Sequence, residues 1–516
     1  MTFINFFETL KKQAEERPDQ SAFIFMDESI TWKQYHDTVN SVANSIIRIG
    51  LKPGDSIATI LPQSPAFMYV YMAAAKLGLV IVPLDPRLNA LEMIALCKRI
   101  KPKLLITIAT TERIKENVNT LLKEVDINHV YSYFGDLIIE CALPFESLIE
   151  FSSDHASYLY EPSLDDPLLI IFTSGSTGKP KGAVITHKNI FSICKTTIHS
   201  WGITNQDRML INLPNSHVGG LTNSIGVQLL AGASAVLVPA FNPEETLHLI
   251  QKYKITVTGG VPTMYRIMFR SCSVRNFDVS SIRVLRVSGE PSSAELINEI
   301  KRNFVNVTIA TSWGMTETSG FFTFTKPNDD INIVANTVGA PGDGYQMKIL
   351  KTNDTWAQTA EIGEILVKGD SVISGYLNEE DNKNSFYNGW LKTGDLGYLD
   401  ENNYLHFAGR LKEMYISGGY NVYPLEIESF LNKYPGVSAS VIIAIPDEIW
   451  GEVGCAFIIP HDNTNLDIES LKEYCKKGLA DYKQPKKFII ERNLPKTAIG
   501  KIAKQEIKRY LEKYID

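Results

Sequence analysis

The chain has 516 residues, with 51 lysines and arginines against 58 aspartates and glutamates and a formal net charge of −7. At roughly 100–200 residues per domain this length predicts two to four structural units, and 44% hydrophobic with 21% charged residues is ordinary for a globular protein. The composition excludes collagen, coiled coil and extended disorder, and the mild acidity disfavours a general nucleic-acid surface, which needs a basic excess.

Signals for a membrane, for secretion or for metal binding are weak. The first 20 residues form an amphipathic stretch of mixed charge, without the basic start and apolar core of a signal peptide. The most apolar segment, residues 66–84, is broken by Lys76, Gly78 and Pro83, so it falls short of the roughly 18 uninterrupted apolar residues of a membrane span. The six cysteines lack CxxC spacing and nearby histidines. We expect a cytoplasmic protein with no membrane span, no zinc site and no disulfide framework.

Through the first 410 residues, helical patterns alternate with short apolar runs. The runs are bounded by glycine, proline or polar turns, which predicts buried strands joined by helices. They cover residues 56–62, 78–84, 103–108, 166–174, 234–240 and 283–289. This alternation predicts an α/β fold of layered subdomains, to which residues 362–375 add a β-rich piece.

The pattern changes after Gly409. Residues 425–433 predict a helix, residues 438–448 and 452–460 predict strands, and a second helix is expected from Asp467, whose side chain suits a helix N-terminus. A unit of about 100 residues is an ordinary domain. We therefore predict a large N-terminal domain over residues 1–410 and a small α+β C-terminal domain over residues 411–516.

The most informative segment is residues 173–187, TSGSTGKPKGAVITH, which follows the predicted strand 166–174. Its glycines let backbone N–H groups approach an anion, its hydroxyls add donors and its lysines neutralise charge, so it suits polyphosphate. A Walker A loop does not fit, because Lys179 follows Gly175 at the wrong interval and Pro180 replaces the expected Ser or Thr. The other alternative is a surface linker.

Two further segments carry groups that suit a nucleotide. In residues 312–318, SWGMTET, the indole of Trp313 can stack on a base, and the nearby carboxylate suits Mg²⁺ beside phosphates. In KTGDLG, Asp395 is a carboxylate in a glycine-flanked turn, and such a group can accept both hydroxyl protons of a ribose. Taken alone, Trp313 would be core packing, Asp395 a turn cap and Arg410 a surface cation.

Together with residues 173–187, four segments match the adenylate-forming superfamily in the right order: 312–318, 389–410, 411–428 and 494–504. On these motifs the chain resembles that superfamily, which includes acyl-CoA synthetases, adenylation domains of peptide synthetases and luciferases. The resemblance spans essentially the whole chain. It implies that the C-terminal domain is mobile and closes over the N-terminal domain.

The resemblance also implies residues for ATP and magnesium. Trp313 would lie against adenine, where most relatives have tyrosine, and Thr316 would bind the α-phosphate. Thr177 and Glu317 would be the Mg²⁺ ligands. The other nucleotide-site residues are Thr173, Ser174, Gly175, Ser176, Gly178, Lys179, Lys181, Gly289, Glu290, Pro291, Gly314 and Met315.

Further roles come from the same resemblance. Asp395 would bind the ribose diol with the help of Arg410. Lys501, in KTAIGKIAK, would bridge the substrate carboxylate and the α-phosphate, where two anions must meet and a mobile point charge can stabilise the pentavalent state. A closed, dry site would also protect the mixed anhydride from water.

The resemblance places a hinge at Lys412, two residues after the motif arginine. Hinges are a few residues that absorb large backbone changes. A turn there would remove Lys501 from the site and bring residues 417–420, SGGY, to it. Gly418 and Gly419 would then let the thin pantetheine arm of CoA pass the backbone; the alternative is a simple turn.

The acyl site is less defined. By resemblance, residues 213–222 place His217 next to the acyl group, as a gate or lining residue, although a lone histidine is otherwise a core residue. Gly314 stands where acetate-specific relatives carry a second indole, so we expect a longer or wider acid. We favour a fatty or otherwise apolar acid, aliphatic over aromatic.

These features predict an ATP-dependent carboxylic acid–CoA ligase that forms acyl-AMP and pyrophosphate, then acyl-CoA and AMP, with ATP, Mg²⁺ and coenzyme A as cofactors. The alternative is a stand-alone adenylation enzyme that loads an aliphatic or aryl acid onto the pantetheine of a carrier protein. A non-catalytic nucleotide-binding protein would be expected to have lost Lys501, Glu317 or Asp395, and all three are present.

Overall fold

A computed structural model describes residues 5–150, 160–173, 180–290, 292–461, 464–495 and 502–511. The chain divides into two compact units, one of Met1–Gln346 with Lys368–Gly389 and one of Met347–Val367 with Trp390–Asp516. The second unit thus takes in two stretches that the sequence assigns to the N-terminal domain. This division concerns packing, whereas the predicted boundary after residue 410 concerns movement and stays a prediction.

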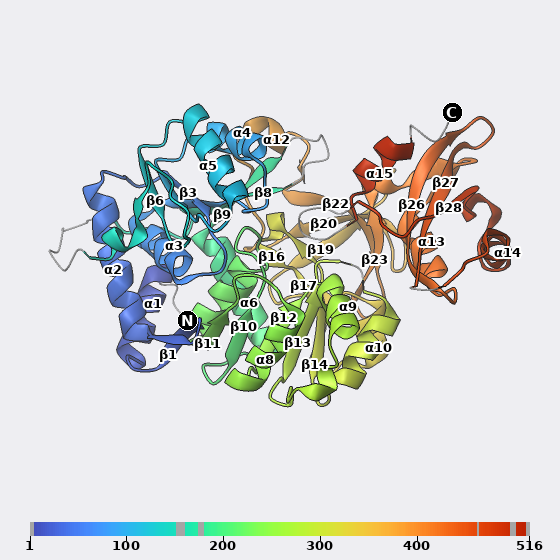
Figure 1. The fold of residues 1–516 in the computed structure, drawn as a ribbon. Helices are drawn as coiled ribbons and strands as arrows, with labels where there is room; N and C mark the ends of the chain where they lie inside the picture. The colour runs from blue at the N-terminus through green and yellow to red at the C-terminus, as the bar shows by residue number, and fades with distance from the viewer. Residues whose placement is uncertain are drawn as a thin grey trace. The chain divides into compact units, whose positions relative to one another are not determined.

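The first unit is built around two seven-stranded sheets (Figure 1). One sheet has the order β14 (Thr308–Ser312), β13 (Val284–Ser288), β12 (Val257–Gly260), β10 (Arg208–Ile211), β11 (Ser234–Leu237), β1 (Ser21–Phe25) and β2 (Glu28–Thr31). The other has the order β7 (Leu143–Pro144), β6 (His129–Ser132), β5 (Leu104–Thr107), β3 (Ser56–Ile60), β4 (Val80–Pro83), β8 (Pro167–Thr173) and β9 (Lys181–Thr186). In each sheet all pairings are parallel except the last. The predicted α/β fold is confirmed.

Helices cover these sheets. They are α1 (Phe6–Glu16), α2 (Trp32–Arg48), α3 (Pro65–Leu77), α4 (Ala90–Ile100), α5 (Glu112–Glu124), α6 (His187–Trp201), α7 (Val227–Ala231), α8 (Pro243–Tyr253), α9 (Pro262–Ser271), α10 (Ala294–Asn303), α11 (Ile331–Asn336) and α12 (Glu379–Asn382). Shorter turns are η1 (Phe145–Leu148), the π-helix η2 (Leu221–Gly226), η3 (Val274–Asn276) and η4 (Thr316–Thr318). Small strands are β15 (Gly314–Met315), β16 (Gly320–Phe321), β17 (Thr323–Phe324), β18 (Ala340–Pro341) and β21 (Phe386–Tyr387).

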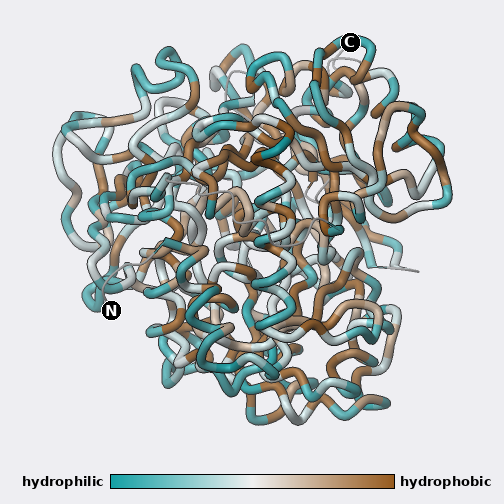
Figure 2. The backbone as a smooth tube through the Cα atoms, turned by 90° about the vertical axis from the view of Figure 1, so that its left-hand side faces the viewer, coloured by the Kyte–Doolittle hydropathy of each residue, from teal (hydrophilic) through white to brown (hydrophobic). Residues whose placement is uncertain are grey.

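Burial follows the pattern of each helix. Apolar side chains of α8, α9 and α10 pack with those of β10, β11 and β13 in one core, while α3 is buried on nearly every face, as its almost uniformly apolar sequence requires. Ser64 caps the start of α3, and Gly78, with φ of 66°, ends it. Along the backbone, hydrophobic and hydrophilic stretches alternate, and many peripheral loops are hydrophilic (Figure 2).

The second unit contains two antiparallel-rich sheets. The first includes β19 (Gln346–Leu350), β20 (Gly363–Lys368), β22 (Trp390–Leu399) and β23 (Leu405–Arg410). The second has the order β25 (Tyr420–Val422), β24 (Tyr415–Ser417), β27 (Gly451–Pro460) and β26 (Val437–Asp447), with β28 (Lys487–Ile490) on β27. Its helices are α13 (Pro424–Leu431), α14 (Ile468–Gly478), α15 (Lys504–Leu511), η5 (Leu411–Glu413) and η6 (Asp481–Lys483). Asp467 caps α14 as predicted, accepting a hydrogen bond from the Ser470 amide at 2.9 Å.

Within the described residues, no helix is long and apolar enough to cross a bilayer. The six cysteines are free thiols, and four of them are buried.

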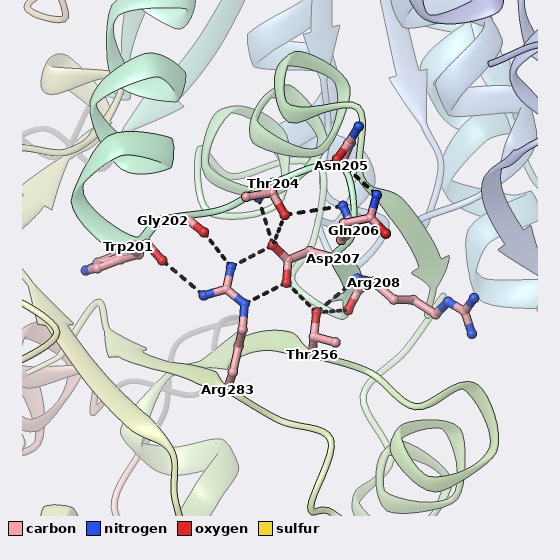
Figure 3. Close-up of polar contacts among 9 residues, drawn as sticks. All are labelled: Trp201, Gly202, Thr204, Asn205, Gln206, Asp207, Arg208, Thr256 and Arg283. Carbon is pink, nitrogen blue, oxygen red and sulfur yellow. Dashed lines mark hydrogen bonds and ion pairs between the residues drawn. The ribbon is translucent and has the colours of Figure 1, made fainter. Parts of the chain in front are cut away.

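A half-buried ion pair ties together the amino-terminal ends of three strands (Figure 3). Asp207, which precedes β10, is 4% exposed and lies 2.6 Å and 2.7 Å from the guanidinium of Arg283, which precedes β13. Thr256, which precedes β12, donates a hydrogen bond to the same carboxylate at 2.7 Å. Burial alone would raise the pKa of Asp207, but hydrogen bonds from Arg283, Thr204 and Thr256 outweigh it and hold the pKa below its ordinary value.

Replacing Asp207 with asparagine is expected to destabilise the first unit by about 2–3 kcal/mol, because it leaves the Arg283 cation without its partner. The loss is smaller than for a fully buried pair, because the Arg283 side chain stays 40% exposed. A thermal melt followed by circular dichroism measures it as a lower melting temperature. Asp278→Asn, which removes an exposed ion pair with Lys254, is the control and should leave the melting temperature unchanged. If both variants have the same melting temperature, the Asp207–Arg283 pair does not stabilise the unit as proposed.

Candidate active site

The phosphate-loop candidate begins and ends at the paired strands β8 and β9. Thr173, the last residue of β8, lies opposite Lys181, the first residue of β9, in antiparallel register. The loop residues Ser174, Gly175, Ser176, Thr177, Gly178 and Lys179 lie outside the described residues. What the structure places is the pair of side chains at the two ends of the loop, Thr173 and Lys181.

Glu317 lies beside this pair. It sits in the short turn η4 and is 5% exposed. Its Oε1 accepts a hydrogen bond from the Tyr376 hydroxyl at 2.8 Å and a long one from Thr173 Oγ1 at 3.5 Å. Residues that are 144 positions apart in the sequence are thus brought together at the carboxyl end of β8.

Tyr376 joins Glu317 to Lys181. The Lys181 ammonium lies 4.9 Å from the centre of the Tyr376 ring and 3.4 Å from the Asp381 carbonyl oxygen. Burial, followed by the neighbouring Glu317 charge, raises the pKa of Tyr376 well above its ordinary value. The tyrosine is therefore a hydrogen-bond donor at neutral pH. Sequence reasoning missed it, because nothing in residues 374–380 marks a partner that lies 59 positions away.

The residues 313–316 lie at the carboxyl end of β14. Trp313 is 8% exposed and packs edge-to-face with Phe322, at 6.3 Å between ring centres. Thr316 is also 8% exposed. Gly314 is fixed by its backbone, because an added Cβ would lie 2.0 Å from the Gly320 carbonyl oxygen across the β15–β16 pair. This close approach explains the glycine at position 314; Met315 follows it in β15.

Gly289 and Glu290 lie at the carboxyl end of β13. Gly289 has φ of 93°, a conformation that favours glycine. Glu290 Oε2 accepts a hydrogen bond from Thr263 Oγ1 at 3.2 Å, while its buried Oε1 has no partner among the described residues. Pro291 lies outside the described residues.

His217 precedes the π-helix η2 and its side chain is exposed. Its Nδ1 accepts a hydrogen bond from the Gly219 amide at 3.0 Å, which places the ring proton of the neutral form on Nε2. Gly220 is required by its surroundings, because a Cβ there would lie 2.3 Å from the Pro214 carbonyl oxygen. Single π-helical turns occur often at functional sites.

Arg286 is a second residue that sequence reasoning missed. It is 3% exposed on β13, and its guanidinium donates to the Asn223 carbonyl at 2.6 Å and to Ser224 Oγ at 3.3 Å. Burial lowers the pKa of Arg286 to about 10. The side chain thereby fastens η2 to the sheet.

In the second unit, Asp395 and Arg410 lie opposite each other on β22 and β23. Asp395 is 3% exposed, and the Arg410 Nε lies 2.9 Å from its Oδ1. The two residues are therefore direct neighbours, and their role toward a ribose stays a prediction.

The predicted hinge and CoA segment also lie in the second unit. Lys412 is exposed in η5, and the neighbouring Glu413 forms an ion pair with Lys504 of α15 at 2.7 Å. Gly418 and Gly419 have φ of 57° and 84°; a Cβ at Gly418 would lie 2.6 Å from the Trp450 ring. Lys501 lies outside the described residues.

The described residues fit a magnesium–nucleotide complex. Glu317 is a buried carboxylate whose described partners are neutral hydroxyls, and no ion pair reaches it within the described part of the chain. A buried carboxylate without a cation is costly. Mg²⁺ binds through one or two carboxylates together with phosphates and water, so Glu317 would hold the ion while Lys181 and Thr173 face the phosphates.

Comparisons with known proteins match this chain over nearly its whole length. The family model for the AMP-binding enzyme matches residues 10–377, and that for the AMP-binding enzyme C-terminal domain matches residues 426–501. The chain is 33% identical to 2-succinylbenzoate–CoA ligase of Bacillus licheniformis over 96% of its length and 98% of the relative's. It is 30% identical to long-chain-fatty-acid–CoA ligase FadD13 of Mycobacterium tuberculosis, with 96% of each chain covered.

A solved structure gives the same result. The o-succinylbenzoate CoA synthetase MenE from Bacillus subtilis, in complex with the acyl-adenylate intermediate OSB-AMP, superposes with a TM-score of 0.85 at 28% identity, over 98% of this chain and 99% of that one. The fold, the motif order and the family models agree. The chain belongs to the AMP-binding enzyme family, in which it is an AMP-forming acyl-CoA synthetase, an ATP-dependent ligase with ATP, Mg²⁺ and CoA as cofactors.

Proposed function

We propose that this ligase acts on a medium- or long-chain fatty acid or a similarly apolar carboxylic acid. The observation that supports this choice is an apolar cavity between the sheet and helices α8 and α9. Relatives differ in the acids that their names give, an aryl dicarboxylic acid for one and a fatty acid for another. The choice of acid therefore rests on the side chains of this chain.

The cavity is small, about 10 Å³, which is room for about one water molecule, so an acyl chain enters it only if lining side chains move. Two of its lining residues are the flexible side chains Met264 and Met268, which can move to admit a methylene chain. Gly259 and Gly260 line it at the carboxyl end of β12, the sheet edge that also carries Gly289 and Trp313. The other lining residues are Asn212, Phe241, Thr246, Ile250, Thr258, Tyr265, Leu285 and Phe304.

The proposed division of roles combines the sequence motifs with the contacts of Glu317, Thr173 and Lys181. Glu317 holds the metal, Thr173 and Lys181 face the phosphates, and Trp313 and Gly289 border the base at neighbouring strand ends. Asp395 and Arg410 bind the ribose, and Lys501 brings the substrate carboxylate to the α-phosphorus. The carboxylate oxygen then forms a bond to phosphorus as pyrophosphate leaves, and the CoA thiol later attacks the acyl carbon as AMP leaves.

The test is pyrophosphate release from MgATP over a panel of acids, each with and without CoA. We expect release that depends on an apolar acid, is multiplied by CoA, and is accompanied by thioester. If pyrophosphate release stops after a single turnover even with CoA present, the acyl acceptor is the pantetheine of a carrier protein and not CoA. Preference for short or dicarboxylic acids would contradict the apolar substrate.

Gly260→Val tests the cavity itself. A Cβ at Gly260 would lie 3.3–3.5 Å from Met264 atoms, so the variant can fold while narrowing the space. We expect the acid with the highest kcat/KM to be a shorter one than for the wild type. For the longest acids kcat/KM should fall about tenfold, since each methylene kept out of the cavity loses roughly 0.8 kcal/mol of burial free energy. Ile267→Ala, on the exposed side of α9, is the control. An unchanged chain-length profile would show that the acyl chain lies elsewhere.

A further inference from the structure

We propose that Tyr376 is a positioning residue for MgATP: its hydroxyl orients the Glu317 carboxylate, and its ring holds the Lys181 ammonium beside it. The inference rests on the proposed roles of Glu317 and Lys181 at the nucleotide. It adds a residue that lies outside every motif identified in the sequence. Tyr376 itself need not touch the nucleotide.

Of the two hydroxyls that contact Glu317, that of Tyr376 makes the stronger hydrogen bond. At 2.8 Å the Tyr376 hydroxyl is well placed, whereas the Thr173 hydroxyl at 3.5 Å is at the limit of a hydrogen bond. Both reach the same oxygen, Oε1, so the other oxygen of the carboxylate remains for a metal ion. Hydrogen bonds to the partner oxygen of a ligating carboxylate fix its orientation and tune metal affinity.

The ring contact acts on a different charge. The Lys181 ammonium lies 4.9 Å from the ring centre, within the range of a cation–π interaction. One further donor reaches the Asp381 carbonyl at 3.4 Å. Because an ammonium carries three donors, Lys181 keeps hydrogen-bonding capacity for a phosphate oxygen.

The backbone fixes Tyr376 without help from a ligand. Its segment pairs with β9 through a bridge between Tyr376 and Ala183, and the Leu377 amide donates to the Gly182 carbonyl at 2.8 Å. The Tyr376 amide donates to Asn382 Oδ1 at 2.8 Å. One anchored side chain therefore sets the spacing between the metal-binding anion and the phosphate-binding cation.

The test is calorimetric binding of ATP to the full-length protein in the absence of any acid, with and without Mg²⁺. Tyr376→Phe removes the hydroxyl and keeps the ring, so the affinity for MgATP should fall about tenfold while that for metal-free ATP stays unchanged. Tyr376→Leu removes both contacts and should also weaken metal-free ATP, by roughly two- to fivefold. Tyr35→Phe is the control, since it deletes another buried tyrosine hydroxyl, which donates to the Met68 carbonyl.

Two results would overturn the inference. Wild-type affinity of Tyr376→Phe for MgATP would show that the hydroxyl does not position Glu317. An equal loss with and without Mg²⁺, together with a lower melting temperature than Tyr35→Phe, would show a purely structural role. If the wild-type protein itself binds ATP equally with and without Mg²⁺, the proposed role of Glu317 fails, and the inference fails with it.

Discussion

Lys501→Ala is expected to abolish acyl-AMP formation and to leave thioester formation from supplied acyl-AMP largely intact. In the first step two anions meet, the acid carboxylate and the α-phosphate, and a cation placed where the pentavalent charge develops lowers that barrier. Removing a single such group typically costs two to three orders of magnitude in rate, so the loss should be of order 10²–10³. In the second step a thiol attacks an acyl carbon, which needs no cation at phosphorus.

The two half-reactions are measured separately, as pyrophosphate release with acid and ATP, and as thioester from acyl-AMP and CoA. Lys508→Ala serves as the matched control, because Lys508 is exposed on α15 and has no assigned contact with substrate. Equal loss of both half-reactions in Lys501→Ala would refute the division of roles between them.

Lys412→Pro is expected to spare acyl-AMP formation and to block the thioester step. Proline fixes φ near −65°, and a backbone that must adopt another value then pays about 3 kcal/mol or more, which corresponds to roughly a hundredfold slower step. Lys412 lies in the exposed turn η5 between the two sheets of the second unit, so the substitution should leave the packing of either sheet unchanged.

Single-turnover thioester formation from acyl-AMP is the measurement, and Lys412→Ala is the control, which removes the charge but keeps the backbone free. If Lys412→Pro turns over like the wild type, the pivot lies at another residue. If Lys412→Ala is as slow as the proline variant, the side-chain charge rather than the backbone rotation is what matters.

The strands of the first unit could be predicted, because burial on both faces forces near-continuous apolar runs. The runs 56–62, 78–84 and 103–108 became β3, β4 and β5 with one or two residues of difference at their ends. A helix such as α3 was harder, because a helix buried on all sides has no polar face to give a period. The division into units could not be predicted, because residues 347–367 pack with partners far along the chain.

For the candidate site, sequence reasoning named residues that stand in recognisable motifs. It missed residues whose role depends on a contact with a residue far away in the sequence. Asp395 and Arg410 belong to the first kind, and the structure brings them together at 2.9 Å. Tyr376 and Arg286 belong to the second kind. Arg286 lies in an apolar strand and Tyr376 in the polar stretch 374–380. Only the fold shows that Tyr376 contacts Glu317 and that Arg286 contacts the turn η2.

The Asp207–Arg283 pair lies before the starts of β10 and β13, whereas Gly289 and Trp313 follow the ends of β13 and β14. Because these strands run parallel, the ion pair and the residues proposed to border the adenine lie at opposite rims of one sheet. Changes at the two rims should therefore combine additively, since distant sites without shared partners do not couple. A lineage of such enzymes could then adapt to a warmer habitat by substitutions at one rim while its nucleotide site at the other rim stays unchanged.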